Sequence, residues 1–169
     1  PILDLLKEKI TPFFGAADKT WLQTVKWCID HDLVQQGMTQ LQEGLFTWIC
    51  LWLQQKGFES EYFDWKKKEG REFVSSLLSK AIQAKEPEEN WRGELKNKAK
   101  LAQELLEDPL LISLASITAQ LTDLRNDINH GGYTKTSKAS TFSEKLSILY
   151  HQVNDQIASE ATKTPQAPN

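Results

Sequence analysis

The chain has 169 residues, of which 40% are hydrophobic and 25% are charged, and its formal net charge is −3. These values are typical of one soluble globular domain with a real core. The net charge argues against a protein that coats nucleic acid through bulk positive charge. It is compatible with a local basic cleft, because an enzyme contacts only a few phosphates.

Cysteine usage and hydropathy indicate the cellular compartment and bear on metal and membrane binding. Cys28 and Cys50 fall within apolar helical patterns, and the chain has no CxxC pair or Cys/His cluster. We therefore expect two buried thiols in a reducing, cytoplasmic compartment, with no metal and no cofactor. No apolar run reaches the 18 or so residues that span a membrane, and no signal peptide is evident, so we expect no membrane partner. Because the chain begins at Pro1, we expect a fragment of a longer protein.

Helical periodicity dominates the first third of the chain. A short helix is predicted over 2–10. A second helix begins after Asp18, a preferred N-cap residue, and runs to Ile29. A third helix is predicted over 33–56, where apolar residues step by three and four, and Gly57 ends it. Its core-facing stripe consists of Val34, Met38, Leu41, Leu45, Trp48 and Trp52.

Residues 58–108 differ in composition from the segments on either side. They hold the run Lys66–Lys68 and a charged stretch over 86–90. Two helices are predicted in this block, over 71–84 and 91–107. We interpret the block as a helical insertion between the core helices, either packed beside the bundle or forming a flap. The lysine run is typical of a solvated face.

Asp108 and Pro109 predict a new helix, because a cap residue is followed by proline at the first helical position. This helix should end at Gly131–Gly132. A last helix is predicted from the capping box Thr141–Glu144, and the tail 161–169 is expected to be disordered. The two apolar stripes are Leu111, Leu114, Ile117, Leu121, Leu124 and Ile128, and then Phe142, Leu146, Leu149, Val153 and Ile157. The sequence therefore predicts one all-α bundle over 1–160.

The C-terminal end of the helix that starts at Pro109 carries Arg125, Asn126, Asn129 and His130. Asn126 and His130 are four residues apart, as are Arg125 and Asn129, so each pair shares a helix face. RNA cleavage without a metal requires proton transfer from the ribose 2′-hydroxyl and to the 5′-oxygen, and stabilisation of negative charge on phosphorus. Imidazole and guanidinium groups supply these functions, and an asparagine can orient either one.

A purely structural explanation of the same residues exists. Arg125 could pair with Asp123 or Asp127 on the helix surface, and His130 could act as a cation at the helix C-terminus. The spacing of Arg125 and His130 alone does not separate the two explanations. The wider sequence context favours the chemical one.

The segment Leu124–Gly132, with the order Arg-Asn-x-x-x-His at the end of a bundle helix, resembles the signature of HEPN ribonucleases. The helix that contains Gln35–Glu43 is similar to the helix before an insertion in the C-terminal effector domains of CRISPR-associated CARF–HEPN proteins. The resemblance covers roughly 19–56 and 109–157, and the middle block has no counterpart. It implies a HEPN-like helical bundle.

The resemblance also implies an activity. The chain would be a metal-independent endoribonuclease that cuts single-stranded RNA to 2′,3′-cyclic phosphate and 5′-hydroxyl ends, as the effector half of an antiviral CRISPR-linked protein. A homodimer would bring two copies of Arg125 and His130 into one cleft, and a missing N-terminal sensor domain would bind cyclic oligoadenylate. Arg125 would stabilise phosphate charge, His130 would move protons, and Asn126 would orient one of them.

Other residues are candidates for RNA contact. Asn129 follows from its position beside the motif, and Lys135 and Lys138 lie in the following loop, within reach of phosphates. Trp65 and Trp91, in the middle block, are candidates for stacking on unpaired bases, the alternative being a place in the core.

Two alternatives to the enzyme remain open. One is a catalytically inactive HEPN-like dimerisation or RNA-binding module, and the other is a structural helical adaptor in which the motif is a coincidence. RNA cleavage that survives a chelator would indicate the enzyme, and RNA binding without cleavage would indicate the module. An adaptor would do neither.

Overall fold

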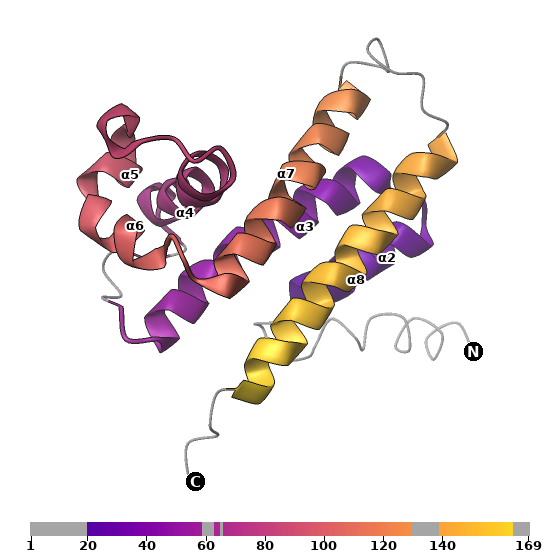
Figure 1. Ribbon diagram of the computed structural model, residues 1–169. Helices are drawn as coiled ribbons and strands as arrows, with labels where there is room; N and C mark the ends of the chain where they lie inside the picture. The colour runs from indigo at the N-terminus through magenta and orange to yellow at the C-terminus, as the bar shows by residue number, and fades with distance from the viewer. Residues whose placement is uncertain (1–19, 59–62, 65, 130–138, 164–169) are drawn as a thin grey trace, which may run out of the picture. The chain divides into compact units, whose positions relative to one another are not determined.

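The computed structural model describes residues 20–58, 63–64, 66–129 and 139–163 (Figure 1). All regular structure within these ranges is helical, which confirms the predicted all-α class. No helix in them is long and apolar enough to cross a membrane. The predicted helix over 2–10 lies outside the described residues. The elements are α2 Thr20–Asp30, α3 Val34–Gln55, α4 Lys68–Ser76, the π-helix η2 Leu77–Gln83, the 3-10 turn η3 Glu88–Asn90, α5 Gly93–Asn97, α6 Ala99–Leu105, α7 Pro109–Asn129 and α8 Ala139–Lys163.

The described chain divides into two compact units. The first contains the described residues up to Gly44 and those from Asp127 onward, and the second spans Leu45–Asn126. The first unit therefore holds α2, the beginning of α3, the last residues of α7, and α8. The second holds the rest of α3, the helices of the middle block, and most of α7.

In the first unit α2 packs along α8 (Figure 1), and two glycines bring α3 close to its neighbours. A Cβ atom at Gly37 would lie 2.7 Å from Cδ2 of Leu146 and 3.1 Å from Cβ of Cys28. A Cβ atom at Gly44 would lie less than 3.0 Å from three atoms of the Trp21 ring. These approaches seal a core of buried side chains: Leu22, Val25, Cys28, Met38, Leu41, Leu146, Leu149, Val153 and Ile157.

A residue in the left-handed backbone conformation follows each of the helices α2 and α3. The α2 helix closes with Asp32 at φ +55°, while the Leu33 N–H donates to the Cys28 carbonyl at 2.8 Å. The α3 helix closes with Gly57 at φ +89°, and the Phe58 N–H donates to the Leu53 carbonyl at 3.2 Å. Both are Schellman motifs, and the second confirms the predicted stop at Gly57.

The second unit is built on aromatic and leucine side chains. Phe63 and Phe73 meet edge to face, with ring centroids 5.7 Å apart, and both are fully buried. A Cβ atom at Gly70 would lie 3.1 Å from the Asp64 carbonyl oxygen, so this glycine allows α4 to sit against the chain at Asp64. The other fully buried members of this core include Val74, Leu77, Leu78, Leu95, Leu111 and Leu114.

The helix predicted over 91–107 is broken in the structure. The chain leaves helical geometry at Lys98 (φ −116°, ψ 35°), which separates α5 from α6. The Lys98 side chain is only 10% exposed: its ammonium is paired with Glu94 and lies 5.8 Å from the centre of the Phe73 ring. The prediction of one helix was therefore wrong at this point, where a lysine in an otherwise helical run turns inward.

The long helix α7 begins as predicted. The Asp108 carboxylate accepts the N–H groups of Leu110 at 2.9 Å and Leu111 at 3.1 Å, which caps the helix. The predicted stripe on α7 is buried up to Leu124, and Ile128 is half-buried.

The last helix differs from its prediction at both ends. It begins at Ala139, so Thr141 lies inside the helix and is not its cap, and Phe142 is only half-buried. The Ser143 hydroxyl instead donates to the Asp32 carboxylate at 3.4 Å. Residues 161–163 are helical, and 164–169 lie outside the described residues.

Candidate active site at the end of α7

The structure places three of the six residues that the sequence singled out. Arg125, Asn126 and Asn129 lie in the last two turns of α7. The Arg125 side chain is half-buried, whereas Asn126 and Asn129 are exposed. The other three candidates, His130, Lys135 and Lys138, lie outside the described residues.

The position of Arg125 follows from the anchoring of α7. Leu121 is fully buried and Leu124 is 5% exposed, so the turn that carries Arg125 is fixed by core packing. The first turn is fixed by the Asp108 cap, 17 residues before Arg125 in the sequence. A charged group on a well-anchored helix keeps its geometry better than one on a loop, which suits a group that must meet a reacting phosphate.

A contact that the sequence did not reveal lies beside the candidate residues. The Gln35 amide donates to the side-chain oxygen of Asn129 at 3.3 Å, and it links the first turn of α3 to the last residue of α7. Both side chains are exposed, so the bond is worth at most about 1 kcal/mol. Because the two residues are 94 positions apart, no local spacing could have identified the pair. Gln35 does lie in the helix that carried part of the family resemblance.

Two acidic residues are close to Arg125 in the sequence. Asp123 is exposed and Asp127 is half-buried, each two positions away along the chain. Arg125 engages other groups in the folded chain. A carboxylate close to the guanidinium would offset part of the charge that Arg125 presents to a phosphate.

Trp91 is not a stacking platform for bases, contrary to the sequence-based hypothesis. It is 2% exposed, and its indole N–H donates to the Glu86 carbonyl at 2.8 Å. A local carbonyl satisfies the polar edge of the ring, which lets the whole side chain enter the core in spite of its charged sequence neighbours. Trp65, the other stacking candidate, lies outside the described residues.

The described thiols are poor nucleophiles. Burial, with a smaller contribution from the Asp64 carboxylate, raises the pKa of Cys50 to about 12, and burial also raises the pKa of Cys28. Both therefore stay protonated at neutral pH. Within the described ranges, no three His, Cys, Asp or Glu side chains form a group that could hold a metal ion.

Comparison with known proteins adds no relative: no protein-family model, no curated protein and no solved structure matches the chain. The resemblance to HEPN ribonucleases therefore rests on the residues themselves. It consists of the order Arg125, Asn126 and His130 in the sequence, within a chain whose described residues are all helical around α7.

Proposed function

We propose that the chain is a metal-independent endoribonuclease of the HEPN type that cuts single-stranded RNA. One observation carries the proposal. A guanidinium and an amide, Arg125 and Asn126, are adjacent in sequence near the end of a capped and deeply packed helix, and His130 follows five residues after Arg125. These are the groups that the reaction needs, in the order of the HEPN signature.

The proposed chemistry is an internal transesterification. A general base removes the proton of the ribose 2′-hydroxyl, the 2′-oxygen forms a bond to phosphorus, and the bond from phosphorus to the 5′-oxygen breaks. A general acid protonates the departing 5′-oxygen. The products are a 2′,3′-cyclic phosphate and a 5′-hydroxyl, so all atoms and protons balance without water or a redox partner. Arg125 stabilises the extra negative charge on the phosphoryl oxygens.

The proton transfers fall to His130, with Asn126 orienting the imidazole or the phosphate. One imidazole can act as base or as acid in the cleavage step, so a second group is needed for the opposite role. A homodimer with a composite cleft would supply it through a second copy of His130. In the proposed whole protein, an antiviral CRISPR-linked effector, an N-terminal sensor that binds cyclic oligoadenylate would control this alignment.

The test is cleavage of an end-labelled single-stranded RNA in excess chelator. We expect cutting by the wild-type chain, and loss of cutting in Arg125→Ala and His130→Ala. Arg125→Lys keeps the charge but loses the two-pronged hydrogen bond, so it should restore only a small part of the activity. The same strand with 2′-deoxyribose at every position should stay intact, because it lacks the attacking hydroxyl. Cleavage of that strand, or full activity of His130→Ala, would rule out this mechanism.

The second candidate is a binding or dimerisation module without activity. The acidic residues Asp123 and Asp127, each two positions from Arg125 in the sequence, favour this alternative. A negative charge near Arg125 would weaken its stabilisation of the transition-state phosphate. Under this alternative the wild-type chain binds RNA or self-associates, yet the labelled strand remains whole at every protein concentration. Light scattering on the same samples measures self-association directly.

A further inference from the structure

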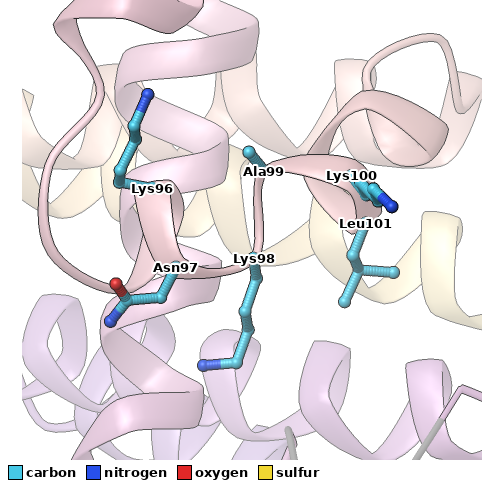
Figure 2. A pocket seen from close by; sticks show the side chains of 6 residues that line it. All are labelled: Lys96, Asn97, Lys98, Ala99, Lys100 and Leu101. Carbon is cyan, nitrogen blue, oxygen red and sulfur yellow. The ribbon is translucent and has the colours of Figure 1, made fainter.

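A basic hollow lies beside the break between α5 and α6. It has a volume of about 390 Å³, and the residues that line it include three lysines and no acid (Figure 2). The lining residues are Lys96, Asn97, Lys98, Ala99, Lys100 and Leu101. In a chain with a net charge of −3, this hollow, called here the α5–α6 pocket, is a local concentration of positive charge.

One of the three lysines is part of the pocket's structure. The Glu94 carboxylate accepts hydrogen bonds from the Lys98 ammonium and, at 3.1 Å, from the Asn97 amide. The pKa of Glu94 is lowered, mainly by the hydrogen bond from Lys98, so the carboxylate is ionised at neutral pH and offsets the Lys98 charge. Lys98 therefore holds the break in place, and the charge that faces a ligand comes from the other two lysines.

Lys96 and Lys100 are exposed, and they extend in different directions. Figure 2 shows the Lys96 ammonium on one side of the break and the Lys100 ammonium on the other. A site for one small anion needs donors that converge on a point. Two diverging ammonium groups instead suit an extended polyanion whose successive charges pass along the surface.

We propose that the α5–α6 pocket binds the phosphate backbone of single-stranded RNA, with Lys96 and Lys100 each contacting one phosphate. The choice of RNA as the polyanion rests on the proposed function, whereas the basic character of the pocket does not. Such contacts position a strand and add affinity without reading its sequence. The pocket would thereby add a second contact with the RNA strand, besides that of Arg125.

The experiment measures binding of a fluorescent single-stranded RNA with 2′-O-methyl groups throughout, which cannot undergo the proposed reaction. Wild type is compared by fluorescence anisotropy with the double variant Lys96→Gln/Lys100→Gln. A matched control, Lys80→Gln/Lys145→Gln, removes two other exposed lysines and the same net charge. Each lost phosphate contact reduces the steepness of log K against log salt by about 0.7. The slope of the pocket variant should therefore be less steep than that of wild type by about 1.4. The control should keep the wild-type slope.

The salt series also gives an affinity ratio. Because the salt dependence of the pocket variant is less steep by about 1.4, the ratio of wild-type to variant RNA affinity should fall about sevenfold between 50 and 200 mM salt. Glu94→Gln provides a variant in which RNA affinity should change in the opposite direction. Removing the carboxylate leaves the Lys98 charge without its offset, so RNA affinity at low salt should rise. A thermal melt followed by circular dichroism checks that each variant is folded.

Four results would overturn the inference. If the pocket variant binds like wild type, the pocket does not contact RNA, and the cleavage assay still decides the proposed function separately. If wild type does not bind the strand, the pocket proposal and the proposed ribonuclease both fail. If oligoglutamate of equal charge competes as well as RNA in wild type, the pocket is a site for acidic peptides. If inorganic phosphate displaces the strand better than chloride at equal ionic strength, the pocket is a small-anion site.

Discussion

The approach of α2 to α3 at Gly44 predicts an unusual response to a helix-favouring substitution. Gly44 is buried in the interior of α3, and a Cβ atom there would lie 2.9 Å from Cγ of Trp21 and closer still to two other ring atoms. Replacing a helical glycine by alanine normally stabilises a helix by about 1 kcal/mol. Overpacking a close contact costs about 1–3 kcal/mol. We therefore expect Gly44→Ala to lower the free energy of unfolding by about 1 kcal/mol, because the Trp21 ring must move.

The assay is urea unfolding followed by circular dichroism, with a thermal melt as a second measure. For a chain of this length, about 1 kcal/mol corresponds to a fall in Tm of about 2–4 °C. The background Trp21→Ala supplies the control, since it removes the ring that meets the new methyl group. In that background Gly44→Ala should stabilise by about 1 kcal/mol, which reverses the sign of the effect. Stabilisation of the same size in both backgrounds would show that Trp21 does not pack on Gly44.

Four further substitutions or treatments test other parts of the structure. Asp108→Ala should lower the free energy of unfolding by about 0.5–2 kcal/mol through loss of the α7 cap, measured by urea titration. Cys28 and Cys50 should not react with a thiol reagent in the folded chain, and both should react in denaturant, as absorbance of the released product will show. The folded-state pKa of Glu94 is lowered, so its stabilising contribution is present above its unfolded pKa and is lost as the pH falls through the folded pKa. Glu94→Gln should therefore weaken the fall in Tm on acidification below the pKa of an unperturbed glutamate. Asp123→Asn should raise RNA affinity at low salt, since it removes a negative charge near Arg125, and unchanged anisotropy titrations would count against RNA binding at the end of α7.

The helices α3 and α7 were predictable because local signals agree with the core that they face. Asp108 caps α7 and Gly57 ends α3, and each signal acts within a few residues of its own position. Most residues of the predicted apolar stripes of both helices are buried, whereas Val34, Trp48 and Ile128 are half-buried. In these segments the local preference of the chain and the tertiary packing favour the same structure.

The middle block was harder to predict because tertiary contacts override its helical pattern. Lys98 has an ordinary helix propensity, and nothing near it in the sequence indicates that its ammonium lies beside Phe73, 25 residues earlier. The π-helix after α4 has no evident sequence signal either. Trp91 was a candidate for stacking on unpaired bases with a place in the core as the alternative, and one carbonyl group, that of Glu86, is enough to satisfy its indole and allow burial.

The candidate site shows the same division between local and distant information. Arg125 and Asn126 could be selected from sequence because the chemistry of a residue type and its spacing on a helix are both local properties. The contact from Gln35 to Asn129 could not, since it depends on where the start of α3 meets the end of α7 within the first unit. Groups that carry charge or protons can therefore be proposed from sequence, whereas groups that hold them in place must be read from the fold. For this reason the first variants to separate catalysis from positioning are Arg125→Ala, which removes a charge, and Gln35→Ala, which removes only a hydrogen bond.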